Sequence, residues 1–214
     1  SDCLVGSEMC IRDSYMIVHH PQWQKAREIV QSDILGDLIQ VDSVFSYNNQ
    51  ADLENIRNSS KMGGGGLPDI GVYTLGSVRF VTGQEPVEIQ HADIKYVNGV
   101  DVWALAAFDF PKFKFTSITS MRMAPRQEVT FQGTEGFIKL TAPFNPMVYD
   151  KAEIIQRMND GTEKVFSYPG VSHYVNQIEA FSDAVLNGKT YPCSLEFSQG
   201  TQSMIDSVFD FAAG

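Results

Sequence analysis

The chain has 214 residues, a formal net charge of −10, 43% hydrophobic residues and 11% aromatic residues. This length and composition support one large or two small folded domains with a buried core, and they exclude extended disorder. The acidic balance argues against nucleic acid or an anionic membrane as a partner, and no apolar run approaches the roughly 20 residues that span a bilayer.

Residues 1–14, SDCLVGSEMCIRDS, differ in character from the rest of the chain. They show no helical or strand periodicity, and their scattered charges rule out a signal peptide. Residues 4–14 resemble the translation of a transposase adapter used in sequencing libraries; the alternative is an ordinary N-terminal tail. We therefore expect residues 1–14 to be an artefact and the natural sequence to begin near Tyr15, inside a longer gene. Cys193 is then the one native cysteine of the three.

The next part of the chain predicts two helices around one strand. Apolar residues recur at helical spacing over residues 21–31, where Pro21 suits a first helical turn. Residues 38–47 alternate and contain β-branched and aromatic residues, which predicts a strand. A polar loop then ends in four consecutive glycines, and residues 69–82 predict an apolar helix.

After Pro86 the sequence changes to short strand-like segments separated by Gly, Pro or Asn. The predicted strands are residues 87–97, 102–110, 112–121, 128–132, 137–141, 152–158 and 163–168. Two predicted helices follow, at residues 173–186 and 197–211. Strands that are close in sequence are expected to be antiparallel neighbours. The prediction is therefore an α+β fold in a single domain, residues 15–214, with a large, mostly antiparallel sheet and helices on one face.

The densest group of chemically active residues follows the glycine run. Asp69 and Tyr73 are four residues apart, so a helix places them on one face. A phenol can exchange a proton, but its ordinary pKa near 10 requires a nearby cation to act near neutral pH. The alternative is structural: Asp69 caps the helix start, and Tyr73 is half-buried with a hydrated hydroxyl.

Several common kinds of site do not fit the sequence. The four glycines follow a polar loop rather than a first strand, so they do not form a dinucleotide-binding fingerprint. The four histidines are scattered, and no metal-binding motif is present, so we expect no metal site. No nucleophile elbow surrounds Ser172 and His173, and Cys193 has no basic neighbour that would activate its thiol.

Several segments together resemble one protein family. They are YMIVHHPQWQKAREIV, ILGDL, FSYNN, NIRN, GGGGLPDIGVYTLG, RFVTGQEP, GTEGFIKLTAPF and QIEAFSDAVLNGK. Their order resembles the C-terminal substrate domain of the glucose–fructose oxidoreductase/inositol dehydrogenase/MocA family. They look closest to the branch that contains xylose-type sugar dehydrogenases and trans-dihydrodiol dehydrogenases. The resemblance runs from Tyr15 almost to Gly214.

The resemblance implies a site and a cofactor. Tyr73 is implied as the acid/base group, and Asp69 as the residue that orients the substrate or the catalytic group. His20, Phe45 and Arg57 match positions near the active-site cleft of the family. The cofactor is implied to be NAD or NADP, bound mainly by an N-terminal Rossmann domain that this sequence lacks. That domain would also supply a catalytic lysine, the cation that the phenol requires.

Two hypotheses about function follow. The first is a fragment of an NAD(P)-dependent oxidoreductase that transfers hydride to or from a sugar, polyol or dihydrodiol and is inactive by itself. The second is a non-catalytic sugar-binding or oligomerisation module. In either case we expect homo-oligomers that form through the sheet, and a cytoplasmic location is favoured over a periplasmic one.

Overall fold

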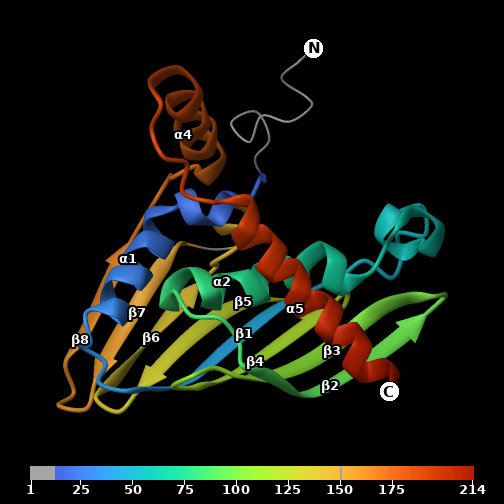
Figure 1. Ribbon diagram of the computed structural model, residues 1–214, viewed down its shortest axis with the longest axis horizontal. Helices are drawn as coiled ribbons and strands as arrows, with labels where there is room; N and C mark the ends of the chain where they lie inside the picture. Colours follow the sequence, from blue (N-terminus) through green and yellow to red (C-terminus); the bar gives the residue numbers. More distant parts are fainter. Residues whose placement is uncertain (1–12, 150) are drawn as a thin grey trace.

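The computed structural model describes residues 13–149 and 151–214, so most of the predicted adapter segment lies outside the described residues. Its centre is a single eight-stranded sheet in the order β2-β3-β4-β1-β5-β6-β7-β8 (Figure 1). The strands are β1 (Leu38–Asn48), β2 (Glu88–Val97), β3 (Val100–Asp109), β4 (Lys114–Ser120), β5 (Arg122–Gly133), β6 (Gly136–Thr141), β7 (Glu153–Met158) and β8 (Glu163–Ser167). The predicted α+β class and the mostly antiparallel sheet are confirmed.

One pair of strands departs from the expected pairing. β4 and β5 are joined through Met121 alone, yet they are not neighbours, because β1 lies between them. β1 pairs parallel with β4 and antiparallel with β5. The chain therefore steps across the end of β1 at Met121, whose carbonyl accepts a hydrogen bond from the Asn49 amide at 3.2 Å. The expectation that strands close in sequence are antiparallel neighbours is wrong for this pair.

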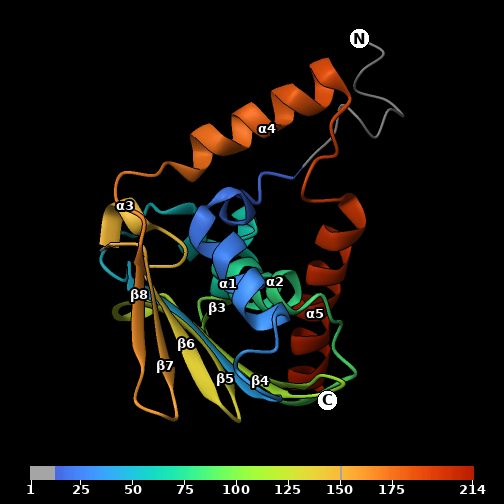
Figure 2. The same cartoon turned by 90° about the vertical axis from the view of Figure 1, so that its left-hand side faces the viewer.

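Helices cover one face of the sheet (Figures 1 and 2). The helices are α1 (Pro21–Gln31), α2 (Val72–Thr82), α3 (Pro146–Tyr149), α4 (His173–Asn187) and α5 (Leu195–Ala213), with short helical turns η3 (Met16–His19), η4 (Ile56–Asn58), η5 (Ser60–Met62) and η6 (Leu67–Gly71). α1, α2 and α5 pack over the sheet, whereas α4 projects from the body (Figure 2). The core between helices and sheet contains the fully buried rings of Trp23, Phe115, Phe131 and Phe144. No helix within the described part of the chain is long and apolar enough to cross a membrane.

α1 begins with a histidine cap and is anchored by a tryptophan. The His20 ring Nδ1 accepts a hydrogen bond from the Gln22 amide at 3.1 Å, and Pro21 occupies the first helical position. The Trp23 indole donates to the Pro143 carbonyl at 2.8 Å, so this large buried ring also has its polar atom satisfied.

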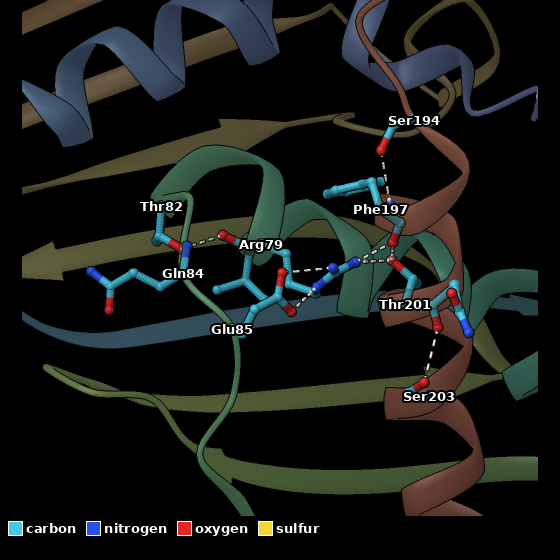
Figure 3. Close-up of polar contacts among 10 residues, drawn as sticks. Arg79, Thr82, Gln84, Glu85, Ser194, Phe197, Thr201 and Ser203 are labelled. Atoms are coloured by element: carbon cyan, nitrogen blue, oxygen red, sulfur yellow. Dashed lines mark hydrogen bonds and ion pairs between the residues drawn. The ribbon is translucent and has the colours of Figure 1, made fainter.

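A buried arginine joins α2 to α5 (Figure 3). The Arg79 side chain is only 3% exposed and forms a two-point ion pair with Glu85, at 2.6 Å and 2.7 Å. Its Nη1 donates to the Phe197 carbonyl at 2.5 Å and to the Thr201 hydroxyl at 2.7 Å. The guanidinium also lies 4.5 Å from the centre of the Phe197 ring. These contacts hold α5 against α2.

Candidate functional site

The glycine run brings the loop that carries Arg57 close to the start of the second helix. The Gly64 amide donates to the Ser59 carbonyl at 2.9 Å, and the Gly65 amide donates to the Arg57 carbonyl at 3.1 Å. A Cβ atom at Gly64 would lie 2.5 Å from that Arg57 carbonyl oxygen, and Gly65 has φ +139°. Only glycine allows this backbone conformation together with so close an approach.

Asp69 lies at the centre of a polar cluster built from three elements. Its Oδ2 accepts a hydrogen bond from Arg57 Nε at 2.5 Å and another from the Tyr47 hydroxyl at 3.1 Å. Tyr47 comes from β1, Arg57 from η4 and Asp69 from η6. Within the described residues Asp69 caps no helix, because the N-cap position belongs to Gly66. The capping alternative for Asp69 is therefore wrong.

The Tyr73 ring lies in an aromatic cluster one helical turn beyond Asp69. It stacks on Tyr15, with ring centres 5.9 Å apart and an angle of 13° between the planes. Phe45 and Phe144 contact it at 6.0 Å and 5.9 Å between ring centres. No residue of the described chain makes a hydrogen bond to the half-buried Tyr73 hydroxyl. The ring is therefore held by packing while its hydroxyl has no partner in 13–149 or 151–214.

The surroundings of Tyr73 favour the protonated phenol. The pKa of Tyr73 is raised to about 12, mainly by burial and also by Tyr174 and Asp69, while Arg57 acts in the opposite direction. The hydrogen bond to Asp69 raises the pKa of the Arg57 guanidinium, so this cation stays charged. Near neutral pH, Tyr73 is therefore a proton donor, and it needs a further cation to act as a base.

A pocket of about 290 Å³ lies beside Tyr73, between α2 and α5. Tyr15, Val72 and Tyr73 line one side, and Phe197 and Thr201 of α5 line another. Asp69 and Arg57 are not among the residues that line it. The pocket therefore adjoins the tyrosine but not the carboxylate–guanidinium pair.

The structure brings four of the five expected site residues together. Phe45 is 3% exposed and supports the Tyr73 ring, while Arg57 is bound to Asp69. His20 lies elsewhere: it is 1% exposed and contacts Tyr168 and His173, at 6.1 Å and 5.9 Å between ring centres.

The sequence reasoning missed Tyr47 and Asp101 as members of this cluster. Tyr47 had a signal, because it follows Phe45 by two residues in a predicted strand and so shares its face. Asp101 contacts the glycine run from β3, and no sequence pattern signals that contact.

The described residues offer no place for the phosphates of a dinucleotide at the glycine run. The amides of Gly64 and Gly65 are bonded to backbone carbonyls, and that of Leu67 to the Asp101 carboxylate. Within residues 13–149 and 151–214 there is also no group of three or more His, Cys, Asp or Glu side chains that could hold a metal ion. The site therefore offers groups for proton transfer and for binding of hydroxyl groups.

Comparison with known proteins identifies the family. The sequence model of the GFO/IDH/MocA C-terminal domain matches residues 23–139, more than half of the chain. The chain belongs to the glucose–fructose oxidoreductase/inositol dehydrogenase/MocA family. Within this family, it is 31% identical over 213 residues to an uncharacterized oxidoreductase of Rhizobium meliloti, covering 97% of this chain and 64% of that one. It is 26% identical over 204 residues to D-xylose 1-dehydrogenase (NADP(+)) 2 of Haloferax volcanii, covering 94% and 62%.

Solved structures of other oxidoreductases share the fold. One is a 3-ketoreductase from Actinomadura kijaniata with NADP and TDP-benzene: TM-score 0.79, 23% identity, 92% of this chain and 61% of that one. Another is an aldose-aldose oxidoreductase from Caulobacter crescentus complexed with glycerol: TM-score 0.82, 18% identity, 94% and 61%. The chain thus spans about three-fifths of the length of these proteins. The recognition of the family and of its C-terminal domain fold from sequence is confirmed.

Proposed function

We propose that this chain is the substrate-side part of an NAD(P)-dependent oxidoreductase that transfers hydride to or from a sugar, polyol or dihydrodiol. Its relatives include a D-xylose dehydrogenase and dTDP-sugar 3-reductases, and structures of the related 3-ketoreductase contain NADP. The observation that carries the proposal is the Tyr73 hydroxyl, which receives no hydrogen bond from any residue that the structure describes and lies one helical turn beyond the Asp69–Arg57 pair. Such a group can exchange a proton with a substrate oxygen.

The proposed reaction interconverts an alcohol and the corresponding carbonyl compound. On oxidation, the substrate carbon loses a hydride and its hydroxyl loses a proton; on reduction, both return. The nicotinamide, when bound, takes up or supplies the hydride. Tyr73 holds the proton, and its pKa of about 12 makes it ready to donate to a carbonyl oxygen. In the oxidation direction a cation must lower that pKa, and we assign this to a group outside the chain.

Asp69 is proposed to hold the substrate. Arg57 and Tyr47 both bind its Oδ2, whereas its Oδ1 receives no hydrogen bond from any residue that the structure describes. The Asp69 side chain is 27% exposed, so Oδ1 can accept a hydrogen bond from a substrate hydroxyl. Arg57 fixes the carboxylate and compensates its charge.

The test is a Tyr73→Phe variant of the complete enzyme, assayed for NAD(P)-linked oxidation of aldoses and dihydrodiols and for reduction of the matching carbonyl compounds. We expect kcat to fall by about 100-fold or more, because general acid–base catalysis contributes that much. Tyr96→Phe, at an exposed tyrosine of β2, is the control and should retain activity. Full activity of Tyr73→Phe would refute the role of this residue. The chain by itself should show no turnover.

A further inference from the structure

Asp101 is a buried carboxylate with an unusual set of partners. It lies near the start of β3 and is 2% exposed. Its Oδ2 accepts a hydrogen bond from the Leu67 amide at 2.6 Å, and the Gly66 amide also donates to this carboxylate. No Lys or Arg of the described chain forms an ion pair with it, as far as residues 13–149 and 151–214 show. Backbone amides are thus its main partners.

The glycine run fits closely around this carboxylate. A Cβ atom at Gly65 would lie 2.1 Å from Asp101 Oδ1, and one at Gly66 would lie 3.1 Å from Oδ2. Any side chain at Gly65 would therefore displace the carboxylate. The Gly65 amide also donates a hydrogen bond to the Arg57 carbonyl. Asp101 and the Arg57 turn together confine the start of the helical segment between them.

That helical segment carries the proposed catalytic groups. η6 begins at Leu67 and continues directly into α2, so Asp69 and Tyr73 lie within the first two turns after the bound amides. The N-cap residue Gly66 has no side chain that could accept a hydrogen bond from the first amides of the helical segment. Asp101, from a distant strand, supplies the acceptor that is missing locally.

We propose that Asp101 is a positioning residue: its carboxylate fixes the start of the η6–α2 segment and thereby the placement of Asp69 and the Tyr73 hydroxyl. The inference rests on the proposed roles of Asp69 and Tyr73. A Ser, Asn or Asp cap at position 66 would accept a hydrogen bond from the second or third residue of the helical segment, which are Pro68, with no N–H, and Asp69. Such a cap would leave the Gly66 and Leu67 amides without the acceptor that Asp101 provides. An acceptor from outside the helical segment is therefore needed to fix these two amides. Burial raises the pKa of Asp101, and the hydrogen bonds from Leu67 and Gly66 oppose that shift.

The first test uses the present chain and needs no activity. The tyrosines are labelled as 3-fluorotyrosine, and the Tyr73 fluorine resonance is identified with Tyr73→Phe. In Asp101→Asn, one carboxylate oxygen is replaced by a nitrogen that cannot accept a hydrogen bond, so the amides of Leu67, Gly66 and Asp101 must share one uncharged acceptor oxygen. We expect the Tyr73 and Tyr47 resonances to shift or to split, while those of Tyr168 and Tyr191 stay in place. Hydrogen exchange at the Leu67 amide should accelerate at least tenfold.

A second variant approaches the same contact from the opposite side. Gly65→Ala places a methyl group where Asp101 Oδ1 lies, and we expect it to perturb the Tyr73 resonance as Asp101→Asn does. Gly63→Ala is the matched control, because Gly63 also has a positive φ, +69°, but has nothing within 4 Å of the added Cβ. Unchanged Tyr73 resonances and unchanged Leu67 exchange in Asp101→Asn, or equal effects of Gly65→Ala and Gly63→Ala, would overturn the inference.

Kinetic measurements on the complete enzyme distinguish the failure of one proposal from the failure of the other. If both hold, Asp101→Asn lowers kcat by about tenfold or more with a smaller change in KM, and it moves the pH profile that Tyr73 sets. If Asp101→Asn moves the Tyr73 resonance while Tyr73→Phe keeps full activity, Asp101 still orders this segment and the catalytic proposal alone fails. If Tyr73→Phe is inactive while Asp101→Asn keeps the wild-type kcat and pH profile, the positioning role of Asp101 is refuted.

Discussion

Among single residues, His20 combines burial with a role that only the neutral ring can fill. Its Nδ1 accepts the α1 cap hydrogen bond, so protonation at that atom would break the cap. The pKa of His20 is lowered from an ordinary 6.5 to about 4, mainly by burial and also by the neighbouring His173. His19 and His173 lie in the same region, and burial lowers their pKa values too. The environment of these three histidines therefore favours the neutral form of each ring.

The folded protein should therefore lose stability in mild acid. The unfolded state binds a proton at His20 below about pH 6.5, whereas the folded state resists it until about pH 4. The contribution of His20 to the free energy of unfolding is fully present above about pH 6.5. It decreases by up to about 3 kcal/mol as the pH falls to about 4. Urea unfolding at pH 7.0 and 4.5 measures the loss.

A matched pair of variants isolates the contribution of His20. His20→Asn keeps a good N-cap and removes the titrating ring, so its stability should depend less on pH than that of the wild type. His91→Asn, at an exposed histidine of β2, should keep the wild-type dependence. If His20→Asn and His91→Asn lose stability equally in acid, the explanation is wrong.

The residues of the site were predictable only in part. The four-residue spacing brought Asp69 and Tyr73 to notice, because a helix translates spacing into a shared face. Arg57 and Phe45 came from the family resemblance, and both contact that pair directly. Asp101 escaped notice because its contact with Leu67 depends on how β3 lies against a distant loop. Local patterns carry no information about such a contact.

At the level of elements, the Arg79 network makes α5 dependent on one buried side chain. Arg79→Ala removes the ion pair with Glu85 and both hydrogen bonds to α5, and we expect it to cost about 3 kcal/mol of unfolding free energy. Arg157→Ala is a close control, since Arg157 also pairs through Nε with a glutamate six residues later, Glu163, but its side chain is 60% exposed. Its cost should stay below about 1 kcal/mol.

Chemical denaturation of both variants compares a buried and an exposed ion pair of the same sequence spacing. Equal losses would show that the contacts with Phe197 and Thr201 contribute nothing to the attachment of α5. Hydrogen exchange along α5 adds a local measurement, because release of this helix should raise exchange there before it does so in α1.

The elements themselves were largely predictable, and their arrangement less so. The ranges of α1, β1, α2 and most later strands follow from apolar periodicity, which reports burial on one face. The first strand after Met121 was predicted too short, because residues 122–127 show no alternation of apolar and polar side chains although they belong to β5. The insertion of β1 between β4 and β5 was missed, because strand order depends on which edge of the growing sheet is still unpaired when each strand joins it.

For the whole molecule, the face of the sheet opposite the helices carries an apolar row. Val44, Ile118 and Leu105 are cross-strand neighbours on β1, β4 and β3. None of them belongs to the core that the helices cover. An apolar row outside the core that the helices cover, with Leu105 and Ile118 partly exposed, is typical of protein interfaces. We propose that a second copy of the chain covers this face.

Self-association should therefore depend on this row. Sedimentation equilibrium should show dimers or larger assemblies of the wild type, and Ile118→Lys should shift them to monomers because it buries a charge in the interface. Leu53→Lys, at an 82% exposed loop residue, is the control and should leave the assembly unchanged. A wild-type chain that stays monomeric at high concentration would contradict the proposal.

The central position of β1 also determines the order in which the protein can fold. β1 is synthesised early, but its two hydrogen-bonding partners, β4 and β5, begin at Lys114 and Arg122. Until the ribosome has released those residues, both edges of β1 are unpaired. Closing so long a loop carries an entropic cost, which slows folding. Tyr47 thus contacts Asp69 from a strand that is completed late, and the site forms with the sheet rather than before it.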